Sequence, residues 1–291
     1  MEIHGDWITL RNGHRIWYKI AGGGSGLPLL VLHGGPGTGH DYLENLDKLA
    51  DARPVIFYDQ LGCGRSDKPD DDRLWHIARC ADEVAEVREL LGLHALHIIG
   101  QSYGGWLLLE YMSGQPKGIA SIVLASTSSS LPEFSAETAV LIAQLPKQHQ
   151  QAIKVHGNKG DYQHTDYQAA VEAFNHAFLC RIDPWPDCIM RTGANIAASK
   201  SSPVMNGPND FTVIGNLKDW DRSVETRDIK LPTLITCGEF DAVSPACAVT
   251  LKKAIPHAEL RLFKGCSHVP HLEDEVNYMN IIEQFLQAHD V

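Results

Sequence analysis

The sequence predicts an α/β fold in which a mostly parallel sheet is covered by helices on both faces. Short, almost wholly apolar runs such as residues 29–32 and 55–58 are typical of strands that are buried on both faces. Helix-length patterns separate these runs, and alternation of strands and helices is the pattern of α/β proteins. The alternation stops between residues 128 and 222 and then resumes, which predicts an inserted segment.

The elements are expected in a definite order along the chain. Residues 7–10 and 15–20 alternate polar and apolar side chains around Asn12-Gly13, which predicts a β-hairpin. Buried strands are then expected at residues 29–32, 55–58, 96–99 and 122–125, with helices at 42–50, 78–91 and 105–113. After the insertion we expect strands at 233–236 and 258–263, and helices at 245–254 and 275–288.

The inserted segment predicts two parts of the molecule. Residues 128–222 contain helical stretches at 137–145 and 167–180 but no convincing core strand. At about 95 residues the segment is far longer than an ordinary connection between core elements. We therefore expect a core made of residues 1–127 and 223–291, and a mainly helical insertion over residues 128–222.

Composition excludes several classes of protein. Of the 291 residues 44% are hydrophobic and 21% are charged, which is ordinary globular composition. The formal net charge of −11 argues against nucleic-acid and anionic-membrane partners, because such binding needs concentrated Lys and Arg. No apolar run exceeds five residues, so no membrane-spanning helix is expected.

The cysteines and histidines give weaker indications. The chain has seven cysteines without a CxxC pair, and its first residues lack the pattern of a secretory signal, so we expect reduced, buried thiols in a cytoplasmic protein. His268 and His271 are three residues apart, but Pro270 lies between them and no HExxH pattern is present. No metal site is therefore expected.

The sharpest local signal is Gly100-Gln101-Ser102-Tyr103-Gly104-Gly105. It follows an apolar strand and opens a helical stretch, which is the context in which G-x-S-x-G carries a nucleophilic serine on a strained turn. The alternative is a glycine-rich turn with an incidental serine. We expect Ser102 to be the nucleophile of a hydrolase.

A serine hydroxyl needs a base, and that base is oriented by a carboxylate. Along a sequence with a G-x-S-x-G serine, the carboxylate follows the serine and the histidine follows the carboxylate. Asp241 follows the strand at 233–236, and His268 follows the strand at 258–263, so both are expected at the edge of the sheet that carries Ser102. A helix cap at Asp241 and a loop histidine at His268 are the alternatives.

An acyl-transfer site also needs donors to its oxyanion. One is expected to be the backbone N–H of Tyr103, directly after the nucleophile. The other is expected from the loop His33-Gly34-Gly35-Pro36-Gly37, whose glycines let the backbone approach a substrate, and we assign it to Gly35. The alternative is that this loop is only a tight turn.

Four motifs together resemble the proline iminopeptidases and related amino acid amidases: HGGPG at 33–37, DQLGCGRS at 59–66, GQSYGG at 100–105, and residues 206–221 from Asn-Gly-Pro-Asn to Lys-Asp-Trp-Asp. The resemblance spans nearly the whole chain. It implies an α/β-hydrolase fold with an eight-stranded sheet, a helical cap over the active site, and removal of an N-terminal residue. It also implies that carboxylates hold the free amino group of the substrate.

The chain departs from this family at the amine-binding carboxylates. The family motif Asn-Gly-Pro-x-Glu ends here in Asp210, which is one methylene shorter. The position after the expected catalytic aspartate, where the family commonly has a carboxylate, is Ala242. We expect Asp210, with help from Glu239, to bind the amine; the alternative is that Asp210 caps a helix or is only a solvated acid. The aromatic residues that could line the pocket are Phe174, Phe178, Trp185, Phe211 and Trp220. The helical spacing of Phe174 and Phe178 favours the core of the inserted segment instead, and we include Trp220 in the expected substrate-binding set.

The sequence therefore predicts a serine hydrolase that cleaves a small amide or short peptide through an acyl-enzyme, with no external cofactor. A specialised esterase or amidase without recognition of a free amine is the first alternative, because Ala242 removes a charge. A non-catalytic ligand receptor is the second. A fluorophosphonate probe would distinguish the receptor from an enzyme, because Ser102 of a non-catalytic receptor would not react with the probe.

Overall fold

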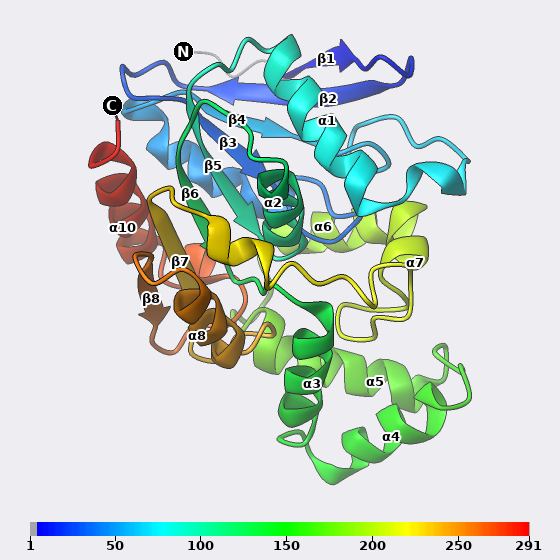
Figure 1. Ribbon diagram of the computed structural model, residues 1–291. Helices are drawn as coiled ribbons and strands as arrows, with labels where there is room; N and C mark the ends of the chain where they lie inside the picture. The colour runs from blue at the N-terminus through cyan, green and yellow to red at the C-terminus, as the bar shows by residue number, and fades with distance from the viewer. Residues whose placement is uncertain (1–4, 291) are drawn as a thin grey trace.

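An eight-stranded sheet lies at the centre of the computed structural model, which describes residues 5–290 (Figure 1). The strand order is β1-β2-β4-β3-β5-β6-β7-β8. β2 pairs antiparallel with β1 and with β4, and the remaining neighbours are parallel, which confirms the mostly parallel sheet. The strands are β1 Gly5–Thr9, β2 Arg15–Ala21, β3 Leu29–Leu32, β4 Val55–Tyr58, β5 Leu96–Gln101, β6 Ile119–Ala125, β7 Thr233–Gly238 and β8 Glu259–Phe263.

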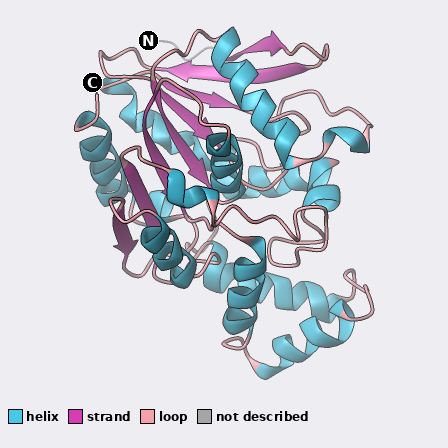
Figure 2. Ribbon diagram, viewed as in Figure 1, coloured by secondary structure: helices cyan, strands magenta, loops and turns pink. Residues whose placement is uncertain are grey.

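The apolar runs form strands because both faces of the sheet are covered (Figure 2). Successive side chains of a strand point to opposite faces. In β3, Leu30 and Leu32 pack into one core, and Leu29 and Val31 pack into the other. A strand with two buried faces is therefore mostly apolar, and its few polar side chains, such as His97 of β5, are hydrogen-bonded inside the protein.

Helices on the two faces supply the rest of these cores. One face is covered by α1 Ile77–Leu90, α2 Tyr103–Ser113 and α8 Pro245–Ala254. The other is covered by the 3-10 helix η1 Asp41–Asp51 and by α10 Glu275–Gln287. The short helices outside the inserted segment are η2 Asp72–Leu74, η4 Glu225–Asp228 and α9 Pro270–Glu273.

Residues 128–222 add no strand to the sheet, and helices α3, α4 and α5 lie together beyond one end of it (Figure 1). The segment leaves and rejoins the core at one place, because the Leu131 amide donates to Trp220 O at 2.9 Å and the Arg222 amide donates to Ser129 O at 2.8 Å. Its helices are α3 Leu131–Ile142, α4 Lys147–Gly157, α5 Thr165–Phe174, the π-helical turn η3 Asn175–Leu179, α6 Asp187–Ala198 and α7 Ser201–Met205.

Some helix boundaries differ from the sequence prediction. α3 starts at Leu131, six residues before 137, because the Ser130 side chain caps it by accepting from the Glu133 amide. The helix expected over 167–180 is divided into α5 and η3. The stretch expected as a helix at 42–50 is the 3-10 helix η1.

Candidate active site

Ser102 lies on the sharp turn between β5 and α2, with φ 57° and ψ −124°. This left-handed conformation is unusual for a residue with a side chain and marks a strained turn. The flanking glycines make the turn sterically feasible. A Cβ on Gly100 would lie 2.3 Å from Gly104 O, and a Cβ on Gly104 would lie 2.1 Å from Leu32 O. The G-x-S-x-G pattern thus has a steric cause in this structure.

His268 and Asp241 meet at the carboxyl ends of β8 and β7. His268 Nδ1 lies 2.6 Å from Asp241 Oδ1, and both side chains are buried. The same carboxylate accepts from the Val243 amide at 2.9 Å, which fixes its orientation. Among residues 5–290, Nε2 of His268 has no hydrogen-bond partner.

The charge state of His268 is set by two opposing effects. Burial disfavours the imidazolium, but the attraction and hydrogen bond of Asp241 outweigh burial, so the pKa of His268 is raised above its ordinary value. Asp210 adds to this attraction. The histidine is therefore well suited to hold a proton once it has taken one.

A cavity of about 420 Å³ brings four of the expected residues together. Ser102, His268, Gly35 and Asp210 all line it. The core also contributes Tyr42, Gln101, Trp106, Ala242, Val243 and Val269. The inserted segment contributes Phe134, Gln168, Val171, Asn175, Leu179, Trp185, Ile189, Thr192, Gly193, Ile196, Ser202, Pro208 and Asn209. The wall is thus largely apolar, with few charged groups.

Two backbone amides beside Ser102 have no internal acceptor. Within residues 5–290 neither the Gly35 N–H nor the Tyr103 N–H donates a hydrogen bond. Tyr103 is the first residue of α2, where the helix dipole favours negative charge. Gly35 has φ 109°, a conformation that glycine adopts easily. Both amides are therefore free to donate a hydrogen bond to a bound group.

Asp210 is a half-buried carboxylate that lines the cavity. It has no hydrogen-bond or ion-pair partner on another residue of the described chain. Burial raises the pKa of Asp210 above its ordinary value, although the nearby His268 opposes this shift. An unpaired acid in an apolar wall is a favourable place for a cation.

Two residues of the expected substrate-binding set lie elsewhere. Glu239 is exposed and does not line the cavity, because its Oε2 accepts from the Gly265 amide at 2.8 Å in the neighbouring loop. Trp220 is also absent from the wall. Its ring packs in the core at 6.3 Å from Trp106, and its Nε1 donates to Glu110 at 2.9 Å. The assignment of these two residues to substrate binding is corrected accordingly.

Of the aromatic residues considered for the wall, Trp185 lines the cavity, whereas Phe174, Phe178 and Phe211 pack on one another. Tyr42, Gln101 and Trp106 were missed as wall residues. Gln101 stands inside the G-x-S-x-G motif, which could have indicated it, but no sequence signal distinguished Tyr42 from a helix core residue.

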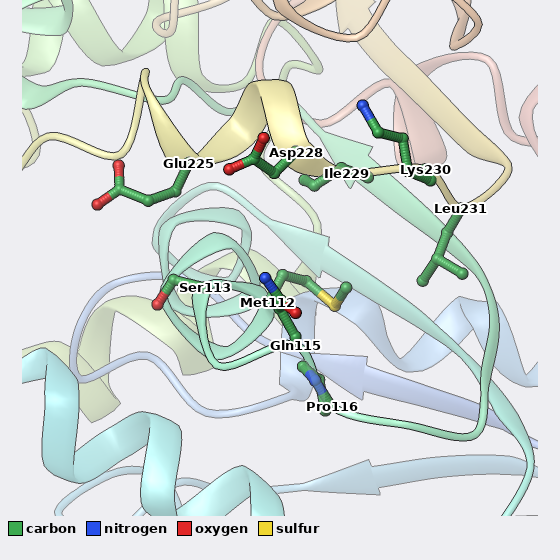
Figure 3. Close-up of a pocket in the computed structure, with 9 residues that line it drawn as sticks. All are labelled: Met112, Ser113, Gln115, Pro116, Glu225, Asp228, Ile229, Lys230 and Leu231. Carbon is green, nitrogen blue, oxygen red and sulfur yellow. The ribbon is translucent and has the colours of Figure 1, made fainter.

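Two other clusters lie apart from this cavity. A hollow of about 290 Å³ between the end of α2 and η4 contains none of the expected site residues; it is lined by Met112, Ser113, Gln115, Pro116, Glu225, Asp228, Ile229, Lys230 and Leu231 (Figure 3). His156, His164 and Asp166 have side-chain ligand atoms within 4.8 Å of one another. However, His164 Nδ1 already accepts from the Asp166 amide at 3.2 Å and caps α5.

His271, three residues after His268, uses its Nε2 to donate to Tyr42 O at 2.9 Å.

Comparison with known proteins defines the class. The family model described as alpha/beta hydrolase fold matches residues 28–275, so the chain belongs to the α/β-hydrolases. A proline iminopeptidase from Lactobacillus helveticus is 39% identical over 286 residues, which are 96% of this chain and 96% of that protein.

Two solved structures agree closely with the whole chain. The proline iminopeptidase of Mycobacterium smegmatis is 34% identical, with a TM-score of 0.92 and 99% of each chain covered. The crystal structure of VinJ is 31% identical, with a TM-score of 0.94, 98% of this chain and 99% of that chain covered. The chain is a member of the proline iminopeptidase family, and it is a serine hydrolase.

Two expectations about the surroundings of the protein can be compared with the structure. Among the described residues, no helix combines the length and apolarity needed to cross a bilayer. All seven cysteines are buried and unpaired, as the sequence predicts.

Proposed function

We propose that this enzyme removes an N-terminal residue, or hydrolyses an amino acid amide, through an acyl-enzyme on Ser102. The observation that carries the proposal is one cavity lined by Ser102, by His268 with its Asp241 partner, and by the unpartnered carboxylate of Asp210. The first three supply nucleophile, base and orienting acid. The fourth supplies a countercharge for a free amine.

Acylation begins when His268 Nε2 takes the Ser102 hydroxyl proton as the oxygen attacks the substrate carbonyl. The carbonyl π electrons move to its oxygen, and the Gly35 and Tyr103 amides donate hydrogen bonds to the oxyanion. The carbonyl re-forms as the C–N bond breaks, and His268 returns the proton to the leaving amine. Asp241 holds the imidazole tautomer and stabilises the imidazolium throughout.

Deacylation repeats the same steps with water in place of serine. His268 accepts a proton from the water that attacks the acyl carbon, and the same two amides stabilise the second oxyanion. Ser102 leaves with the proton from His268, and the product acid departs. Each proton that His268 accepts is returned, so the cycle regenerates the enzyme.

Asp210 is proposed to bind the α-ammonium group of the substrate, and residues 128–222 are proposed to form the cap that supplies it. The carboxylate lies on the inserted segment, whereas Ser102 and His268 lie on the core. A substrate would therefore be fixed between the two parts of the molecule. Loss of one partner of a desolvated ion pair costs on the order of hundredfold or more in binding.

A panel of aminoacyl p-nitroanilides and amino acid amides tests this function. Free-amine substrates are expected to be hydrolysed. Ser102→Ala is expected to lower kcat by about 10³-fold or more, as other deletions of a triad residue do. Activity confined to N-blocked or ester substrates would contradict the assignment.

A second candidate is an esterase or amidase that does not recognise a free amine. Ala242 favours it, because this buried residue puts a methyl group in the cavity wall where the family commonly has a carboxylate. Kinetics of Ala242→Glu separate the candidates. Aminopeptidase activity that appears only in this variant would support the second candidate, whereas activity already present in the wild type would favour the first.

A further inference from the structure

The hydroxyl of Tyr42 joins the two loops that surround Ser102. The Gly34 amide donates to Tyr42 Oη at 2.8 Å, and Tyr42 Oη donates to Gln101 Oε1 at 2.5 Å. Gln101 Nε2 donates in turn to the carbonyl of His268 at 3.0 Å. One chain of hydrogen bonds thus runs from the HGGPG loop, past the nucleophile turn, to the loop that carries the base.

These groups are closely packed and shielded from bulk water. Tyr42 is 5% exposed and Gln101 is 2% exposed. A Cβ on Gly34 would lie 2.7 Å from Tyr42 Oη, 3.0 Å from Ser102 Cβ and 3.1 Å from Gln101 Oε1. Burial raises the pKa of Tyr42 well above its ordinary value, so the phenol stays neutral and keeps its donor proton. In such a setting each unmade hydrogen bond is costly.

Two further hydrogen bonds hold the segments that carry Tyr42 and Gly34. The Tyr42 carbonyl accepts from His271 Nε2 at 2.9 Å, which holds η1 against the His268 loop. Thr38 Oγ1 donates to Gly34 O at 2.8 Å, which closes the HGGPG loop on itself. The amide that follows Gly34 is the unpaired Gly35 N–H. Its direction therefore depends on how Gly34 is held.

We propose that Tyr42 is a positioning residue, which aligns the Gly35 oxyanion donor and the His268 loop with Ser102 through Gly34 and Gln101. The proposal rests on the function proposed above. Tyr42 lines the cavity, but within residues 5–290 its hydroxyl bonds only to Gly34 and Gln101. We therefore expect this hydroxyl to contribute to the transition state rather than to substrate binding. An interaction that matters only in the transition state changes kcat more than KM.

Tyr42→Phe is the direct test, because it removes one oxygen and leaves the ring. It leaves the Gly34 amide and Gln101 Oε1 without partners. We expect kcat on an aminoacyl p-nitroanilide to fall about 10- to 100-fold with KM nearly unchanged, as for a small displacement of an oxyanion donor. The Ki of a boronic acid analogue of the tetrahedral intermediate is expected to rise by the same factor.

Tyr278→Phe is the matched control. Tyr278 is also a buried tyrosine beside His271, but its hydroxyl has only a 3.4 Å contact to Thr236 and does not line the cavity. It should retain the wild-type kcat. Gln101→Met breaks the hydrogen-bond chain at its second side chain. The Tyr42→Phe, Gln101→Met double variant should be no slower than the slower single variant, because both act in one unit.

The outcomes separate this proposal from the function on which it rests. Wild-type kcat in folded Tyr42→Phe, a loss carried by KM alone, or fully additive losses in the double variant would overturn the role of Tyr42. If Tyr42→Phe fails to fold, Gln101→Met and the boronic acid Ki decide the question. A wild-type enzyme that a fluorophosphonate does not label at Ser102 would overturn the proposed function instead.

Discussion

Asp241 and Asp210 are both close enough to attract a proton on His268, but their surroundings give them different chemical uses. Asp241 accepts from the Val243 amide and faces the His268 ring, so its oxygens are committed within the protein. Asp210 has no partner on another residue of the described chain and faces the cavity. A committed carboxylate can orient a base, whereas an uncommitted one can bind a ligand.

The raised pKa of His268 predicts the acid side of the pH profile. Protonated His268 cannot accept the Ser102 proton, so kcat/KM should rise with pH through an apparent pKa above the ordinary histidine value of about 6.5. A neutral ester such as p-nitrophenyl acetate isolates this limb, because it has no titratable group. Asp241→Asn removes the attraction that raises the pKa, so the limb should move to lower pH while kcat falls about 10³- to 10⁴-fold. An unmoved limb would contradict the assignment of His268.

Trp220 is predicted to act on stability alone. Its Nε1 donates to Glu110, which also pairs with Arg222 at 2.8 Å. Trp220→Phe leaves this poorly exposed carboxylate with one donor fewer, so the free energy of unfolding should fall by about 1–3 kcal/mol. Urea unfolding measures the loss. A raised KM with unchanged stability would return Trp220 to the substrate site.

At the scale of the element, the turn between β5 and α2 is limited sterically by close backbone contacts of its glycines. Gly104→Ala would bring a Cβ within 2.1 Å of Leu32 O, a backbone atom that cannot move away easily. We expect a destabilisation of about 1–3 kcal/mol or more, with loss of activity. Gly114→Ala at the other end of α2 is the control, since its nearest neighbour would be Tyr111 O at an ordinary 3.5 Å. Equal melting temperatures for the two variants would refute the steric account.

Sequence reasoning predicted the elements that have a strong apolar pattern. The strands at 29–32 and 55–58 have the expected bounds, because a strand buried on both faces leaves a continuous apolar run. α4 was missed because only Ala152 of its eleven residues is buried, so no apolar stripe marks it.

The candidate site was predictable where position on a strand end decides the geometry. Ser102, Asp241 and His268 each follow a parallel strand, and such ends meet at one edge of a sheet. Glu239 lies only two residues from Asp241, yet its side chain turns to the Gly265 amide. That direction depends on a neighbouring loop, which the local sequence does not contain.

At the scale of the whole molecule, the inserted segment is bonded to both loops that follow β7 and β8. The carbonyl of Phe178 accepts from the Ala242 amide at 3.0 Å and from the His268 amide at 3.1 Å. Phe178 lies in the π-helical turn η3, and such turns occur frequently at functional sites. The segment that contains Asp210 therefore also helps to hold the loops that carry Asp241 and His268.

We propose above all that Asp210 binds the free amine of a substrate that Ser102 attacks. The most direct measurement is kcat/KM for one aminoacyl p-nitroanilide and its N-acetyl derivative, with wild type, Asp210→Asn and the control Glu239→Gln. We predict that wild type and Glu239→Gln favour the free amine. Asp210→Asn should reduce this preference on the order of hundredfold, because its kcat/KM should fall for the free-amine substrate and not for the N-acetyl derivative. An unchanged preference in Asp210→Asn, or a wild type that favours the acetylated substrate, would contradict the account.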